Sequence, residues 1–74
     1  MGKPTKVTNS IRTLRFTHGE MTQAELAQRI GVTRQTVIAI EQGRYSPSLE
    51  VAFQIARVFR VPLDDVFQYP DPEG

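Results

Sequence analysis

Two short segments in the first half of the chain are marked at both of their ends, and these marks limit the folds that the chain can adopt. Thr22 and Glu25 have the spacing of a capping box, in which a side chain and the backbone bond to each other at the start of a helix. Gly31 stands where such a helix would end, and Thr33 stands where the next would begin. Gly43 closes the second segment. The sequence therefore predicts two short helices joined by a tight turn.

The rest of the chain predicts three more helices, so the expected fold class is all-α. The first of them follows Asn9 and Ser10, either of which can cap it, and the last begins with Pro62. Between them, a segment after Ser48 is apolar on all but one narrow side, which is typical of a helix in the middle of a domain. The five predicted helices cover residues 10–18, 23–30, 34–42, 49–60 and 62–67.

The composition excludes several classes of function. The 74 residues contain no cysteine, which removes disulfides, thiolate nucleophiles and most zinc sites. The single histidine, His18, has no second imidazole with which to hold a metal or to form a catalytic triad. We therefore expect no catalytic residue, no metal, no cofactor and no enzymatic activity. A core this small also gives only a small free energy of unfolding, to which association with a partner subunit would add.

The sequence predicts a cytoplasmic protein without a membrane partner. No segment approaches the roughly 18 apolar residues of a membrane span, and the N-terminal stretch MGKPTKVTNS lacks the apolar region of a signal peptide.

Charges are distributed unevenly along the chain. Residues 1–44 carry seven basic and three acidic side chains, whereas residues 45–74 carry two basic and five acidic ones. This asymmetry favours one surface that meets a polyanion, unless the segregation is due to chance.

The predicted helix 34–42 has two distinct faces. At about 100° per residue, Val37 and Ile40 fall together and face inward. The other side mixes long polar, branched apolar and small side chains: Arg34, Gln35, Ile38, Ala39 and Gln42. Arginine pairs with guanine, glutamine pairs with adenine and an apolar group contacts the thymine methyl, so this mixture suits the major groove of DNA. Alternatively, Ile38 packs against a neighbouring loop or a partner subunit.

The segment QAELAQRIGVTRQTVIAIEQ, from Gln23 to Gln42, resembles the helix-turn-helix of the phage-repressor class, the Cro/C1 or xenobiotic-response-element type of bacterial and archaeal regulators. Ala27 is the small residue where the two helices touch, and Gly31 makes the turn. The resemblance implies a five-helix phage-repressor-like domain at residues 8–67, with terminal segments at 1–7 and 68–74. In short members of this family the chain ends pair as a small β-ribbon, which TKVT and FQYP would form here.

The resemblance also implies roles for individual residues. The residues that would face the bases are Thr33, Arg34, Gln35, Ile38 and Ala39. The residues that would hold DNA phosphates are Gln23, Gln42, Arg44 and Tyr45. Arg15 and Glu41 match positions that form a partly buried ion pair between the first and third helices. Alternatively, Gln23 and Arg44 are ordinary solvated side chains.

The last predicted helix and its surroundings are more apolar than the end of a chain requires. The residues concerned are Val61, Leu63, Val66, Phe67 and Tyr69. A single module of this size reads few base pairs, and two-fold pairing would place two recognition helices one DNA turn apart. We therefore expect these residues to form a homodimer interface. Alternatively, they complete the core of the monomer.

The sequence thus predicts a transcriptional regulator that binds a palindromic operator in double-stranded DNA as a homodimer. A repressor is favoured because nothing in the chain remains to recruit polymerase. One alternative is the DNA-binding antitoxin of a toxin pair, which implies an unidentified protein partner. Another is a protein-interaction module that uses the same fold without DNA.

Overall fold

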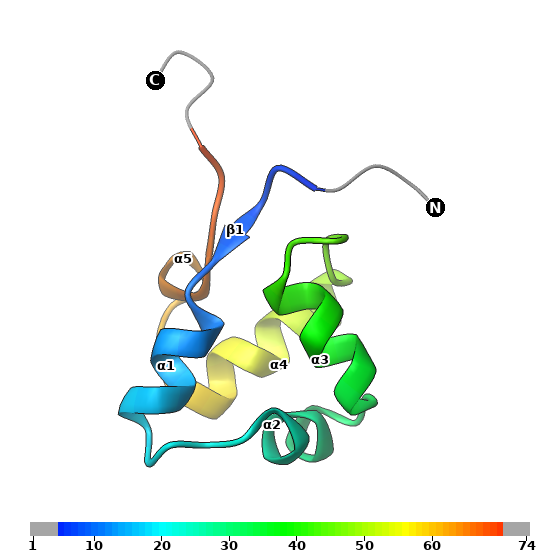
Figure 1. The fold of residues 1–74 in the computed structure, drawn as a ribbon. Helices are drawn as coiled ribbons and strands as arrows, with labels where there is room; N and C mark the ends of the chain where they lie inside the picture. The colour runs from blue at the N-terminus through cyan, green and yellow to red at the C-terminus, as the bar shows by residue number, and fades with distance from the viewer. Residues whose placement is uncertain (1–4, 71–74) are drawn as a thin grey trace.

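The chain folds as five helices and a short two-stranded ribbon, which confirms the predicted fold class (Figure 1). The computed structural model describes residues 5–70, so the expected terminal segments 1–7 and 68–74 lie partly outside the described residues. The elements in chain order are β1 (Thr8–Asn9), α1 (Ile11–Thr17), α2 (Gln23–Ile30), α3 (Arg34–Glu41), α4 (Leu49–Phe59), α5 (Leu63–Val66) and β2 (Phe67–Gln68). Within the described residues, no helix has the length and apolar character needed to cross a membrane.

The reciprocal capping box at the start of α2 is present. Thr22 Oγ1 accepts a hydrogen bond from the backbone N–H of Glu25 at 3.0 Å, and the Glu25 carboxylate accepts one from the Thr22 N–H at 2.8 Å. The helix ends at Gly31, whose left-handed φ of 74° allows the Val32 N–H to bond to the Ala27 carbonyl at 3.0 Å. Both ends of α2 are therefore fixed by local bonds, which defines the turn into α3.

Hydroxyl caps also start the next two helices. Thr33 accepts a hydrogen bond from the backbone N–H of Thr36 at 3.2 Å, and Ser48 accepts one from that of Val51 at 3.2 Å. Each cap of this kind contributes about 1 kcal/mol to stability. The starts of α3 and α4 are thus set by the residues that the sequence indicated.

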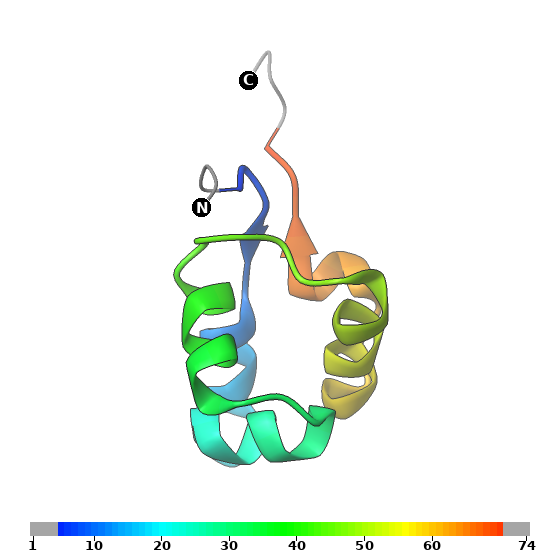
Figure 2. The ribbon, with the colours of Figure 1, turned by 90° about the vertical axis from the view of Figure 1, so that its right-hand side faces the viewer.

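The core lies between α2, α3 and α4 and is completed by α1 and α5 (Figure 2). Its largest fully buried side chains are Phe59, Ile11, Leu26, Ile55, Val37 and Val66. Every helix contributes at least one of these residues. Helices this short are marginal in isolation, so their stability comes from this shared packing.

The expectation that α4 lies in the middle of the domain is wrong. Its buried residues are Ala52, Ile55, Ala56 and Phe59, which share one side of the helix. On the other side, Leu49 is 71% exposed and Phe53 is 52% exposed. Among the residues that the structure describes, the neighbouring helices thus cover only one side of α4.

The chain ends pair as the expected antiparallel ribbon, in which Thr8 lies opposite Gln68 and Asn9 lies opposite Phe67. The sequence placed this ribbon between TKVT and FQYP, whereas the observed pairs lie closer to α1. The backbone N–H of Ser10 extends the pairing by donating to the Val66 carbonyl at 2.8 Å.

Asn9 connects this ribbon to two helices. Its Oδ1 accepts a hydrogen bond from the Ile11 N–H at 3.1 Å, and its Nδ2 donates to the Ile40 carbonyl at 3.1 Å. The sequence left Asn9 and Ser10 as alternative caps of α1, and the side-chain bond at this start comes from Asn9, since Ser10 makes no such bond. The start of α1 is therefore tied to the end of α3.

Arg60 ends α4 in the left-handed region, with φ 59° and ψ 43°. Glycine adopts this conformation at lower cost than any residue with a Cβ, so we expect Arg60→Gly to raise the free energy of unfolding by about 0.5–1 kcal/mol. Urea denaturation followed by circular dichroism measures this change. The same substitution at Arg57, an exposed position inside α4, should instead lower it by about 1 kcal/mol. Equal effects at the two positions would contradict the conformational argument.

Candidate nucleic-acid interface

α2, the turn at Gly31 and α3 form a helix-turn-helix unit. Where the two helices pack together, Ala27 on α2 is 3% exposed and Val37 on α3 is 1% exposed. Ile40 is also buried, one turn after Val37 on the same side of α3. This packing fixes α3 so that its opposite side faces outward.

The outer side of α3 is open to a ligand. Its exposed residues, with the N-cap and C-cap included, are Thr33, Arg34, Gln35 and Gln42, and its half-buried residues are Ile38 and Ala39. The apolar run in the middle of α3 therefore divides, with Val37 and Ile40 in the core and Ile38 at the edge of the outer side. The predicted base-reading residues lie together on this surface.

Thr33 has a structural role in addition to its place on this surface. Its hydroxyl caps α3 and also lies 3.0 Å from the Thr36 hydroxyl. Any contact of Thr33 with a ligand through its hydroxyl must therefore share that group with the cap.

Arg15 and Glu41 form an ion pair with two hydrogen bonds. Arg15 Nε donates to Glu41 Oε2 at 2.7 Å, and Arg15 Nη2 donates to Glu41 Oε1 at 3.1 Å. The two side chains are only 14% and 9% exposed, and Arg15 Nη1 also donates to the Met21 carbonyl at 2.8 Å. The pair joins α1 to the end of α3 and holds the chain just before α2.

Gln23 takes part in the same cluster, which sequence reasoning did not foresee. Its Nε2 donates to Glu41 Oε1 at 3.0 Å, so the amide is held against the carboxylate. A glutamine at the start of a helix carries no sequence signal for such a partner, because the partner comes from a different helix. Because the Gln23 amide is bonded to Glu41, a phosphate at the start of α2 would be contacted by backbone N–H groups of that helix.

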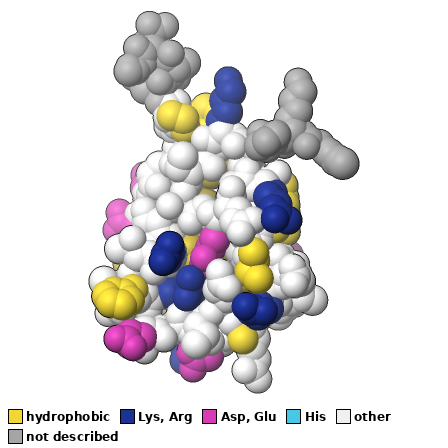
Figure 3. Space-filling view, viewed as in Figure 1, with side chains coloured by type: hydrophobic (Ala, Val, Ile, Leu, Met, Phe, Trp, Pro, Cys, Tyr) yellow, Lys and Arg dark blue, Asp and Glu magenta, His cyan; other side chains and the backbone are white. Residues whose placement is uncertain are grey.

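A groove of about 560 Å³ lies beside this cluster, between α1, α2 and α3. Its lining residues are Arg12, Arg15, Thr22, Gln23, Ala24, Arg34, Glu41 and Gln42. Figure 3 shows Lys and Arg side chains distributed over this face of the molecule around a central acidic group. The groove is polar and carries two exposed cations, Arg12 and Arg34, so it suits an anionic ligand.

Arg12 was missed by sequence reasoning, although a signal for it existed. It precedes Arg15 by three residues and so lies on the same side of α1. Among residues 5–70, none of Arg12, Arg34 and Arg44 forms an ion pair, so these three cations are available to a polyanion.

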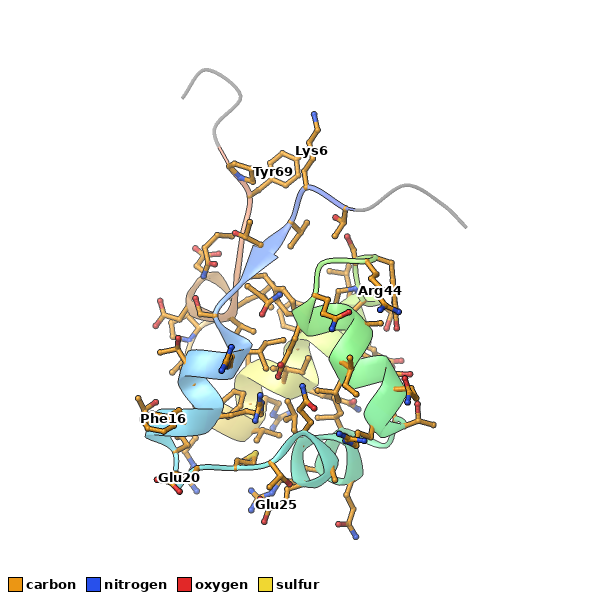
Figure 4. The ribbon with its side chains drawn as sticks, in the orientation of Figure 1. Lys6, Phe16, Glu20, Glu25, Arg44 and Tyr69 are labelled. Atoms are coloured by element: carbon orange, nitrogen blue, oxygen red, sulfur yellow. The ribbon has the colours of Figure 1, made fainter. Side chains whose placement is uncertain are left out.

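Arg44 and Tyr45 lie in the loop that follows α3 (Figure 4). Arg44 is exposed and Tyr45 is 42% exposed. Their position places a cation and a phenol hydroxyl beside the end of α3, while Gln42 lies exposed at its C-cap.

The residues expected at a homodimer interface are divided by the structure. Val66 is fully buried in the core, so its assignment to an interface is wrong. Val61, Leu63 and Phe67 are half-buried and pack against the same core. Tyr69 alone of this set is largely exposed, at 67%. The apolar character of this segment therefore mainly completes the monomer core.

His18 has a packing role. Its ring contacts that of Phe59 edge to face at 5.2 Å between centroids, and its Nδ1 lies 2.9 Å from the Leu14 carbonyl. Within residues 5–70, no group of three or more His, Cys, Asp and Glu residues is arranged to hold a metal ion.

Comparisons with known proteins agree with this geometry. The helix-turn-helix family profile matches residues 11–66, most of the chain. An uncharacterized HTH-type transcriptional regulator of Methanocaldococcus jannaschii is 49% identical over 65 residues, which cover 88% of this chain and 97% of that protein. YgzD, an uncharacterized HTH-type transcriptional regulator of Bacillus subtilis, is 46% identical over 80% of this chain and 88% of its own length.

A phage protein and a solved structure extend the comparison. RstR, the cryptic phage CTXphi transcriptional repressor of Vibrio cholerae, is 36% identical over 58 residues, which cover 78% of this chain and 51% of RstR. A crystal structure from Bacteroides fragilis, of a candidate DNA-binding protein, matches with a TM-score of 0.72 and 19% identity over 84% of this chain and 98% of that one. At that identity the likeness concerns the fold alone. The chain thus belongs to the helix-turn-helix family of Cro/C1-type DNA-binding transcriptional regulators, which are not enzymes.

Proposed function

We propose that this regulator is a repressor that binds a palindromic operator as a homodimer, with α3 in the major groove of each half-site. The observation that carries the proposal is the outer side of α3, where Arg34 and Gln35 are exposed beside the half-buried Ile38 and Ala39. Arginine bonds to guanine O6 and N7, glutamine to adenine N6 and N7, and isoleucine contacts a thymine methyl. Ala39 leaves room for the helix to approach the bases.

Contacts to the DNA backbone would position α3. The N-terminus of α2 carries unpaired N–H groups that suit a phosphate, and Gln23 at this end orients toward Glu41. Gln42, Arg44 and Tyr45 lie at the other end of α3 and would contact a second phosphate region. Backbone contacts on both sides of a recognition helix fix its register without reading sequence.

The homodimer is proposed because a single module of this size contacts little DNA, and the repressor role is proposed because one relative is named a repressor. A single small module buries about 600–1,000 Å² on DNA, whereas a pair with recognition helices about 34 Å apart reads two half-sites. The Vibrio cholerae relative is named a transcriptional repressor, which supports the same role here. A regulator of this kind would act where its DNA is, in the cytoplasm.

Selection of bound fragments from random duplex DNA tests the proposal. We expect enrichment of a two-fold symmetric sequence, and affinity for it that falls steeply between about 50 and 200 mM salt because cations on the protein displace counterions from phosphates. Arg29→Ala is the matched control, because Arg29 is an exposed arginine of α2 outside the groove and should not affect binding. No enriched sequence, or binding that ignores salt, would instead indicate a protein-interaction module.

A further inference from the structure

Asn9, in the ribbon of chain ends, bonds to the end of the helix that carries the proposed base-reading residues. Its Nδ2 donates to the Ile40 carbonyl at 3.1 Å and to the Glu41 carbonyl at 3.4 Å, both in the last turn of α3. We propose that Asn9 is a positioning residue for DNA sequence recognition, which holds the C-terminal end of α3 at the angle at which this helix reads bases. The inference rests on the proposed function and adds a specificity-determining residue that acts through α3.

The position of the Asn9 side chain is fixed by its neighbours. Its backbone lies opposite Phe67 in the ribbon, and the next residue, Ser10, donates its N–H to the Val66 carbonyl at 2.8 Å. Asn9 Oδ1 accepts a hydrogen bond from the Ile11 N–H at 3.1 Å. Val66 and Ile11 are both fully buried, so the core anchors both sides of this short segment. The Asn9 amide is therefore held in place where it meets α3.

The two ends of α3 are held in different ways. Its start is fixed by the Thr33 cap and by the tight turn at Gly31. The last carbonyls of a helix lack the regular partner four residues on, and at the end of α3 Asn9 donates to two of them. The apolar contacts of Val37 and Ile40 determine which side of α3 faces inward. Such contacts are non-directional, so a directed bond is needed to set the tilt of the helix end.

The bond from Asn9 constrains the axis of α3 directly because it reaches the main chain. The ion pair of Arg15 with Glu41 also holds this end, but it reaches α3 through a long side chain. Without the Asn9 bonds, α3 would pivot about its capped start. Ile38 and Ala39 lie near the end that would move, so the bases that they contact should be read less accurately.

The substitution Asn9→Asp removes the bonds to α3 and keeps the rest of the contact. Aspartate retains an oxygen for the Ile11 N–H, whereas its second oxygen would repel the carbonyls of Ile40 and Glu41. We expect affinity for the selected operator to fall by about 5- to 10-fold, which is part of the value of one good base contact, and affinity for random duplex to stay within about twofold. Fluorescence anisotropy measures both affinities, at a temperature where circular dichroism shows the variant folded.

A second selection from random DNA identifies which bases are affected. With Asn9→Asp, the operator positions that lose their preference should be those that also lose it in Ile38→Ala. The positions that lose their preference in Gln35→Ala should keep it in Asn9→Asp, because Gln35 lies near the start of α3, which the Thr33 cap still holds. Equal relaxation at every position would contradict a pivot about the start of α3.

Two further variants serve as controls. Asn9→Ser has no acidic charge, keeps a hydroxyl oxygen for the Ile11 N–H and is too short to reach α3, so it should give the same pattern as Asn9→Asp. Ser10→Ala, at the next position, loses only a side-chain contact to Gln68 at 3.5 Å and leaves the bonds of Asn9 intact. Ser10→Ala should therefore match the wild type on both duplexes.

Amide hydrogen exchange tests the anchor without DNA. The N–H groups of Gly43 and Arg44 donate to the Ile40 and Ala39 carbonyls, each at 3.0 Å, and close the end of α3. In Asn9→Asp these two amides should exchange about 10-fold faster, as expected when about one hydrogen bond of support is lost. The Val32 amide, which closes the end of α2, should keep its rate.

Each outcome has a distinct meaning. Unchanged exchange in Asn9→Asp overturns the anchor, and faster exchange with unchanged discrimination between the two duplexes overturns the role in reading. Equal loss of affinity for both duplexes also overturns that role. If the wild type enriches no sequence, the proposed function fails and the reading role fails with it, while amide exchange still decides whether Asn9 holds the end of α3.

Discussion

Replacing Arg15 with alanine is expected to lower the free energy of unfolding by about 3 kcal/mol. The substitution leaves Glu41, 9% exposed, with the Gln23 amide as its remaining hydrogen-bond partner among the described side chains. An ionised carboxylate that is largely removed from water and has lost its cation is strongly destabilising. The change also removes the Arg15 bond to the Met21 carbonyl, which holds the chain before α2.

Thermal unfolding measures this effect as a decrease of about 12–24 °C in Tm. Arg29→Ala is the matched control, since Arg29 is exposed, forms no ion pair within the described residues, and should change stability by less than about 0.5 kcal/mol. The double variant Arg15→Met with Glu41→Leu should be more stable than Arg15→Ala, because neither charge then remains unpaired. If Arg15→Ala behaves like Arg29→Ala, the ion pair does not brace the fold.

Replacing Gln35 with alanine is expected to weaken binding to the selected operator by about 1–3 kcal/mol and to leave binding to random DNA nearly unchanged. The reason is that a glutamine on the outer side of α3 would bond to a base edge, and that bond exists only with the correct base. Fluorescence anisotropy with operator and random duplexes measures both affinities. Gln28→Ala, at an exposed glutamine of α2, serves as the control and should alter neither.

Arg44→Ala separates backbone contact from base reading. Because Arg44 would contact a phosphate, its loss should weaken operator and random binding to the same extent and should reduce the slope of log affinity against log salt by about one unit. If Gln35→Ala and Arg44→Ala both affect the two duplexes equally, the assignment of base-reading and phosphate-binding roles is incorrect.

The parts of the fold that could be predicted are those controlled by neighbouring residues. Thr22, Thr33 and Ser48 cap the helices that follow them through side-chain bonds spanning three residues, so a short window of sequence contains the whole interaction. The division of α3 into inner and outer sides follows from helical periodicity, and Val37 and Ile40 are buried as expected.

The parts that could not be predicted depend on how the helices are arranged in space. The sequence of α4 is apolar on most sides, but periodicity alone does not indicate which of these sides the other helices cover, and Leu49 and Phe53 remain exposed. Val66 was expected at an interface but is buried in the core, because the sequence does not indicate whether an apolar residue in a terminal helix enters the core or stays outside it. The bond of Gln23 to Glu41 joins residues 18 positions apart and depends on the angle between two helices.

The ribbon that joins β1 to β2 has a practical consequence for binding measurements. Lys6 and Tyr69 lie side by side beyond the ribbon, at the opposite end of the molecule from α2 (Figure 4). A dye or surface tether attached at Lys6 or at Tyr69 would therefore project from the same pole. Protein immobilised through either of these two side chains should keep the start of α2 turned away from the attachment.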